Sequence, residues 1–366
     1  MQKEKILLTG ATGNLGSWLA AEMLRQGKQV IALMRDKTIE AASNRMDSVL
    51  DIAGGTEFSD DIEIVLGDIC KENLGLSMQS RKLQNISKIV HCAACTKFSG
   101  DSEEFHKLIN FQGTYHVLQL ATLLSIPLVH VSSAYIAGKR DGVVKEDEID
   151  IGQHFNNIYE STKCSSEMLV HWWTKLHNTP TIILRPSIVL GDSRNGRIVH
   201  FNSIYAFMRV LDFIAPHVGD DIIRIAPGTA TKNIIPIDYF AQTALHIMDC
   251  AKAGTFHITN PVPFSVQDLD KMYSGIFSGN KYEIVNENAF LKEKPSSLEQ
   301  IIRQVTTTYS SYLTSEPVFD RSNTDAVLKD SDIEFPTMDI EYFGLLVDYA
   351  RSVRWGRTER SSKVSA

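Results

Sequence analysis

The heptapeptide Gly10-Ala11-Thr12-Gly13-Asn14-Leu15-Gly16 decides the fold because of what flanks it. The apolar segment Lys5–Thr9 precedes it and an amphipathic segment follows. In a strand–loop–helix unit, such glycines permit a tight turn, close approach of a pyrophosphate to the backbone, and close packing of helix on strand. The helix N-terminus adds free N–H groups and a positive dipole end. The stretch predicts a phosphate cradle, with a chance glycine-rich loop as the alternative.

Short apolar runs recur through the first 190 residues, and segments of helical period separate them. Runs of this length, buried on both faces, are typical of a parallel sheet. Their alternation with helices predicts an α/β fold, a Rossmann-type doubly wound parallel sheet. The predicted strands are Ile6–Leu8, Val30–Met34, Ile62–Leu66, Ile89–His91, Leu128–Val131 and Thr181–Leu184. Helices are expected after Gly16, over Leu108–Leu124, and from Tyr159 to about Leu176.

The pattern loosens after Gly191, where Gly, Pro, Asp and Arg are scattered through a loop-rich region. We expect a nucleotide-binding domain over residues 1–190, to which residues 234–256 return. Residues 191–233 and 257–356 are expected to form a smaller C-terminal substrate lobe. The polar end of the chain, residues 357–366, is predicted to be a disordered tail.

The end of the second predicted strand indicates which dinucleotide binds. An acidic residue there would hold the ribose 2′-hydroxyl of NAD, but the strand ends in Arg35. A guanidinium can clamp a 2′-phosphate, and Arg45 on the following helix could add a second contact. Asp36 could still reach a ribose. We favour NADP(H), against the alternative that both arginines are solvated surface charges.

Tyr159 and Lys163 stand four residues apart at the start of a predicted helix, so their side chains share one face. A nearby ammonium stabilises a phenolate and lowers the pKa of a tyrosine from its usual value of about 10. The pair is therefore predicted to act in acid–base catalysis. The fifth predicted strand ends in Ser132-Ser133, at the sheet edge where substrates bind in such folds. Either hydroxyl could hold a substrate oxygen as charge develops on it.

Bulk composition excludes several classes of protein. The net charge of −7 shows no basic excess for nucleic acid, and no apolar run approaches the roughly 20 residues of a transmembrane helix. Five cysteines and no signal peptide favour a cytoplasmic location. Cys92 and Cys95 form C-x-x-C, but no second Cys pair or nearby His pair accompanies them, so we expect no metal.

Together these segments resemble the extended short-chain dehydrogenase/reductase family over residues 4–261. Thr9–Gly16 matches its T-G-A-T-G-x-L-G signature, and Ser132-Ser133-Ala134 to Gly138 resembles its S-S-A-x-x-x-G. The resemblance implies that Ser133, Tyr159 and Lys163 are catalytic. It implies adenine contacts from Asp68 and Ile69, nicotinamide contacts from Ala93, Ala94, Pro186 and Ile188, and a propping role for Asn110.

Finer features are similar to the fatty-acyl and thioester reductase branch. They are Leu66–Ser77, Ala94-x3-Phe98, Gly191–Gly196, Asn233–Tyr239 and Phe256–Pro261. This resemblance implies NADPH-dependent reduction of an acyl thioester, on CoA or a carrier protein met in trans, to an aldehyde or on to an alcohol. The alternatives are a ketone or aldehyde reductase, a nucleotide-sugar or hydroxysteroid-type dehydrogenase, or a non-catalytic NADP-binding protein.

Three further predictions concern packing. Trp172 and Trp173 on the catalytic helix could form a homodimer contact or pack within the chain. His91 and His130 are expected to be core histidines with satisfied hydrogen bonds. An apolar group in the loose region could line an acyl-chain pocket or pack inside the lobe: His200, Phe201, Tyr205, Phe207 and Met208.

Overall fold

The computed structural model describes residues 3–98, 100–214, 222–225, 230–277, 281–284, 294–306, 312 and 316–357. The chain forms two compact units. The first comprises Met1–Val189, Ile237–Thr259 and Pro317–Phe335, and the second comprises Leu190–Pro236, Asn260–Glu316 and Pro336–Ala366. The tail predicted to be disordered lies, beyond residue 357, outside the described residues.

The first unit is built on a seven-stranded parallel sheet with the order β12-β7-β5-β4-β1-β2-β3, which confirms the predicted fold class. Chain order reverses between β1 and β4, so the carboxyl ends of these strands flank the place where a dinucleotide binds in such sheets. The strands are β1 (Lys5–Thr9), β2 (Gln29–Met34), β3 (Ile62–Leu66), β4 (Ile86–His91), β5 (Leu128–Val131), β7 (Thr181–Pro186) and β12 (Gly254–Ile258).

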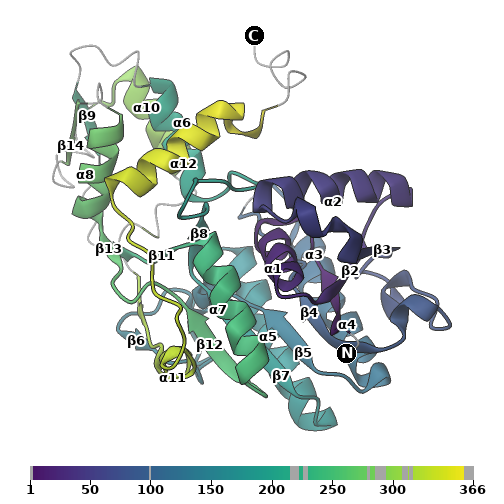
Figure 1. Cartoon of the computed structure of the whole chain (residues 1–366). Helices are drawn as coiled ribbons and strands as arrows, with labels where there is room; N and C mark the ends of the chain where they lie inside the picture. The colour runs from purple at the N-terminus through teal and green to yellow at the C-terminus, as the bar shows by residue number, and fades with distance from the viewer. Residues whose placement is uncertain are drawn as a thin grey trace. The chain divides into compact units, whose positions relative to one another are not determined.

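Helices cover both faces of this sheet (Figure 1). On one face α1 (Asn14–Arg25) packs against α2 (Ile39–Ala53) and α7 (Ile237–Cys250). On the other, α4 (Gly113–Leu124) packs against α5 (Ile158–His177). The strands are apolar on both sides because both sides are covered. Leu7, Ile31 and Ile89 are buried in one cluster with residues of α4 and α5.

The helix expected over residues 108–124 starts earlier in the chain and contains an irregular turn. A short helix, α3 (Glu103–His106), leads into a π-helical turn over Lys107–Gln112, and α4 then begins at Gly113. A π turn carries an extra residue and is common at functional sites. Asn110 lies in this turn and is 2% exposed. The apolar period alone did not reveal the irregular turn.

The segment 317–335 departs from the predicted division, because the sequence places it in the second lobe and the structure places it in the first unit. Strand β15 (Val318–Phe319) pairs with β6 (Val143–Val144). The buried carboxylate of Glu146 accepts hydrogen bonds from the backbone N–H of Asn323 and of Thr324 at the start of α11 (Ser322–Leu328). These contacts attach the segment to the first unit.

The second unit contains four helices and short strand pairs among its described residues. Strands β9 (Ile222–Ile225) and β14 (Lys281–Ile284) are parallel, and β10 (Thr231–Lys232) and β13 (Phe264–Ser265) are antiparallel. The helices are α6 (Ile204–Ile214), α8 (Val266–Ile276), α10 (Ser297–Thr306) and α12 (Ile340–Ser352). Short strands β8 (Ile188–Leu190) and β11 (Ile234–Pro236) complete the described strands. In the described part of the chain, no helix has both the length and the apolar character needed to cross a bilayer.

Candidate active site

The predicted phosphate loop joins β1 to α1, and steric fit explains its glycines. Gly10 has a φ of +71°, and a Cβ there would lie 2.6 Å from the backbone N of Ala93. A Cβ on Gly16 would collide with the carbonyl oxygen of Gly10. Gly13 is the N-cap of α1 and offers no side chain to cap the first N–H groups of the helix. The backbone is therefore arranged as an anion cradle at a helix N-terminus.

The basic residues expected at the end of β2 are near one another. Arg45 donates from Nη2 to the carbonyl oxygen of Arg35 at 3.1 Å, and its Nη1 lies 3.5 Å from the Asp36 carboxylate. Arg35 and Arg45 are exposed. Asp36 is thus paired with a guanidinium, and two exposed arginines lie after β2.

Asp68 and Ile69 follow β3 but differ in orientation. The Asp68 carboxylate accepts from the backbone N–H of Cys70 at 3.0 Å. The Ile69 side chain packs against Gly113, where a Cβ would lie 2.8 Å from Cδ1 of Ile69. Because the Ile69 side chain belongs to the core, a contact from this residue to an adenine would come from its backbone.

Ala93 and Ala94 follow β4 at the same sheet edge. The backbone N–H of Ala93 donates to Oγ1 of Thr9 at 3.2 Å, which joins the ends of β1 and β4. Pro186 ends β7, and Ile188 begins β8 beyond Ser187, whose N–H donates to the carbonyl oxygen of Ile258 at 3.2 Å. The predicted nicotinamide contacts thus lie after β4, at the end of β7 and at the start of β8.

Tyr159 lies in the first turn of α5, which Asn157 caps by accepting from the N–H of Glu160. Burial raises the pKa of Tyr159 to about 12, and a hydrogen bond with Ser133 acts in the opposite direction. The Phe98 ring lies 5.8 Å from the tyrosine ring, centroid to centroid. Tyr159 therefore holds its proton at neutral pH, and the hydroxyls of Ser133 and Tyr159 form a pair.

Lys163 is 3% exposed, and its Nζ donates to the carbonyl oxygen of Val131 at 2.7 Å. Burial lowers the pKa of this ammonium to about 8. The expected lowering of the Tyr159 pKa by Lys163 is not found, because burial of the phenol dominates. The Tyr159 phenol is therefore protonated and can act as a proton donor.

The two adjacent serines at the end of β5 have different partners. Ser132 donates to the carboxylate of Glu167, which also pairs with Arg185 in a fully buried ion pair. Burial disfavours the Glu167 carboxylate, but Arg185 and the hydrogen bonds lower its pKa to about 2. Ser133 is the serine next to Tyr159. This geometry favours Ser133 over Ser132 for the substrate oxygen.

Glu167 was missed by sequence reasoning, and so was its partner Arg185, which directly precedes the predicted contact Pro186. Arg185 also donates to the carbonyl oxygen of Glu148 at 2.8 Å. The spacing of Lys163 and Glu167, one helical turn apart, was an available signal. That spacing places Glu167 on the helix face of Lys163, but it does not predict the buried ion pair with Arg185.

Asn110 uses its whole amide group within the chain. Its Oδ1 accepts from the N–H of Cys95 at 2.8 Å, and its Nδ2 donates to the carbonyl oxygen of Cys95 and to Oγ1 of Thr162. Thr162 lies on α5 beside Lys163. Asn110 therefore links the segment after β4 to α5.

The two core histidines differ from expectation. His91 has threonine hydroxyls near both ring nitrogens, Thr9 at 2.7 Å and Thr114 at 3.1 Å. His130 is 1% exposed, and neither of its ring nitrogens has a hydrogen-bond partner among the described residues. The prediction of a satisfied histidine is wrong for His130.

The aromatic residues considered for an acyl pocket pack inside the second unit. Tyr205 and Met208 are buried, and Tyr205 accepts from the N–H of Gly191 at 2.8 Å. The rings of Phe201 and Tyr205 make an edge contact, and Phe207 makes another with Tyr273. These contacts favour lobe packing for Phe201, Tyr205, Phe207 and Met208.

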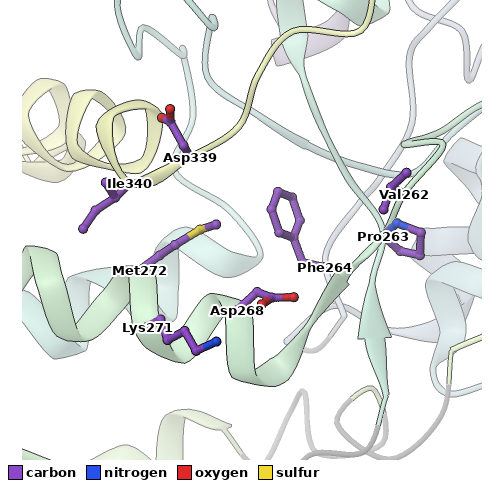
Figure 2. A pocket seen from close by; sticks show the side chains of 8 residues that line it. All are labelled: Val262, Pro263, Phe264, Asp268, Lys271, Met272, Asp339 and Ile340. Carbon is purple, nitrogen blue, oxygen red and sulfur yellow. The ribbon is translucent and has the colours of Figure 1, made fainter.

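A hollow of about 430 Å³ lies within the second unit. Figure 2 shows its lining: Val262, Pro263, Phe264, Asp268, Lys271, Met272, Asp339 and Ile340. Its two carboxylates are engaged in helix caps, Asp268 with Ser265 and Asp339 with the first N–H groups of α12. The hollow contains none of the predicted site residues.

Comparison with known proteins assigns a family. The family model described as "Male sterility protein" matches residues 8–244 of this chain. A nonribosomal peptide synthetase of Aspergillus flavus is 26% identical over 291 residues, covering 74% of this chain and 27% of that protein. The alcohol-forming fatty acyl-CoA reductase of Simmondsia chinensis is 30% identical over 178 residues, covering 43% of this chain and 36% of that protein.

The fold has a close match among solved structures. A thiolation-reductase di-domain from an archaeal nonribosomal peptide synthetase superposes with a TM-score of 0.77 at 18% identity, covering 98% of this chain and 77% of that one. The chain spans 7–36% of the length of the first four curated relatives.

Proposed function

Because the chain belongs to the male sterility protein family, NAD(P)-dependent reductases of the extended short-chain dehydrogenase type, we propose that it reduces an acyl thioester to an aldehyde. A second hydride transfer would give the alcohol. The observation that carries the proposal is the hydroxyl pair of Ser133 and Tyr159 beside Lys163, on the same unit as the glycine cradle. The alcohol-forming fatty acyl-CoA reductase among the relatives supports the substrate class.

The residues of the cradle fit a dinucleotide. Gly10 and Gly16 keep the loop backbone clear, and the first turn of α1 would hold the pyrophosphate. NADPH, when bound, supplies the hydride. We prefer NADPH to NADH because Arg35 and Arg45 offer positive charge at the ribose end, with Asp36 paired to Arg45.

The hydroxyls of Ser133 and Tyr159 would donate hydrogen bonds to the thioester oxygen as negative charge develops on it. The raised pKa of Tyr159 suits this task, because the phenol still has its proton to give. Lys163 would orient the nicotinamide ribose and stabilise the phenolate that remains. The resulting hemithioacetal then releases a thiol and leaves the aldehyde.

Three finer proposals concern the setting of the enzyme. Met168, Trp172 and Leu176 form an exposed apolar stripe at i, i+4 and i+8 on α5, which supports a homodimer through this helix. The thiolation partner of the solved archaeal protein supports a carrier-bound substrate as well as acyl-CoA. All five cysteines are free thiols, which supports a cytoplasmic location.

The test is oxidation of NADPH, followed by absorbance, with acyl-CoA and acyl-carrier thioesters as substrates. We expect turnover with a thioester and lower activity with NADH. One thiol should be released per NADPH oxidised if the product is the aldehyde, and one per two NADPH if it is the alcohol. A ketone and a nucleotide sugar serve as control substrates. Turnover on a control with none on any thioester would overturn the proposal.

A further inference from the structure

Three side chains with different ligand atoms converge beside the candidate active site. Cys95 Sγ lies 3.6 Å from Oδ2 of Asp101 and 3.7 Å from Nε2 of His106. The three ligand atoms all lie within 4.8 Å of one another. Cys95 and His106 are buried, and Asp101 is half-buried. We call these three residues the Cys95 cluster.

Two separations within the cluster match those around a tetrahedral ion. Zinc binds sulfur at about 2.3 Å and nitrogen or carboxylate oxygen at about 2.0–2.2 Å, which places neighbouring ligand atoms about 3.5 Å apart. The two distances from Sγ, 3.6 and 3.7 Å, are close to this value. The third separation, between the Asp101 oxygen and the His106 nitrogen, is no more than 4.8 Å, so side-chain rotation can bring both atoms within bonding distance of one ion.

The environment of His106 supports a ligand role. The ring is fully buried, and its Nδ1 has no hydrogen-bond partner among the described residues. Its Nε2 has a sulfur atom at 3.7 Å as a polar neighbour, which is a weak partner for a buried imidazole.

The competing occupant of the cluster is the Lys97 ammonium, which lies 3.2 Å from Oδ2 of Asp101. The Lys97 side chain is 68% exposed, so it can leave the carboxylate at little cost. The paired oxygen is then available to a cation that the thiol and the imidazole can also reach.

We propose that Cys95, Asp101 and His106 bind a zinc-class divalent cation, with water in the fourth position. Cys92, the other cysteine of the C-x-x-C, is not part of the cluster. The ion would join the end of the segment after β4 to α3. It would thereby brace Phe98, which packs on Tyr159, and Cys95, whose backbone pairs with Asn110. This proposal is independent of which substrate the enzyme reduces.

Cobalt(II) is the probe, because a tetrahedral cobalt–thiolate site absorbs visibly without any enzymatic turnover. The purified full chain is stripped with a chelator under reducing conditions and titrated with Co²⁺. We expect about one equivalent to produce the thiolate absorption, and Zn²⁺ to displace it. Absence of the absorption in the wild-type chain would overturn the proposal.

Variants locate the site. Cys95→Ser should abolish the thiolate absorption, and His106→Gln and Asp101→Asn should each weaken binding about 10–100-fold or more. Cys250→Ser is the matched control, because Cys250 Sγ also lies 3.7 Å from an imidazole nitrogen, Nε2 of His246. Absorption that survives Cys95→Ser, or disappears in Cys250→Ser, contradicts the assignment. Circular dichroism verifies folding, and the nearly isosteric Asp101→Asn keeps the test open if Cys95→Ser fails to fold.

Discussion

The phosphate loop and the end of β5 belong to one candidate site but depend on different parts of the chain, the first on backbone and the second on side chains. The loop depends on backbone space, with Gly10 and Gly16 each placed where a Cβ would collide with backbone. The end of β5 depends on buried polar side chains, with Ser132 on Glu167 and Ser133 beside Tyr159. Steric changes should therefore damage the first region and changes of charge or protonation the second.

Tyr159→Phe should have the largest effect. Removal of the proton donor should lower kcat by about 10²–10⁴-fold, while NADPH still binds. Steady-state turnover and NADPH fluorescence titration measure the two quantities. Tyr115→Phe on α4, where the hydroxyl accepts from Gln119, is the matched control and should keep its activity. An unchanged rate in Tyr159→Phe would refute the catalytic assignment.

Glu167→Gln should mainly affect stability. The change leaves the Arg185 guanidinium buried without a counter-charge, which costs about 3–5 kcal/mol in the free energy of unfolding. Urea unfolding measures it, and Glu167→Gln with Arg185→Met should recover part of the loss. If the single variant is as stable as the wild type, the ion pair has no structural role.

The same carboxylate predicts an acid dependence. Because the folded-state pKa of Glu167 is lowered to about 2, its stabilisation is complete above the ordinary glutamate pKa of about 4.3 and is lost as pH falls towards 2. Glu167→Gln should show a shallower loss of stability over that range. Equal slopes for the two proteins would argue against the lowered pKa.

Gly10→Ala should produce a smaller, binding-specific effect. The residue would have to adopt a φ of +71° with its Cβ 2.6 Å from the Ala93 backbone, and we expect KM for NADPH to rise about tenfold. Gly27→Ala is the control, since Gly27 has a φ of +72° with open space around it. If both substitutions raised KM for NADPH equally, backbone strain alone would explain the increase, and the close approach of Gly10 to the segment after β4 would not be needed.

A pH profile should show the smallest effect. The pKa of Lys163 is lowered to about 8, so the ammonium loses its proton as pH rises through that value. We expect kcat at saturating NADPH to be about half of its maximum near pH 8 and to decline further above it. If kcat does not change up to pH 10, the charge of Lys163 is not required.

The sequence predicted the strands well because each is a short apolar run buried on both faces. It also predicted that Ser133, Tyr159 and Lys163 lie at one sheet edge, since the order of strands follows from right-handed crossovers. It failed where a side chain's direction decides the outcome. Glu167 reads as an ordinary helix residue, and the π turn at Asn110 leaves no trace in the apolar period.

The sequence spacing also did not reveal which side chains come together in the folded chain. The Cys95 cluster uses a cysteine, an aspartate and a histidine from a bent segment, and it matches no familiar ligand spacing. His130 and His91 both lie in apolar strand segments, yet only His91 has hydroxyl groups within hydrogen-bond distance. Such differences depend on neighbours contributed by other strands.

The return of residues 317–335 to the first unit constrains how this protein can be recombined. The polypeptide passes between units after residues 189, 236, 259, 316 and 335. A chimaera that exchanges the second unit must therefore replace three separate stretches of chain at once, and a simple C-terminal truncation removes a strand partner of β6 and the hydrogen-bond donors of Glu146. Laboratory evolution of specificity is consequently better served by point substitutions than by module exchange.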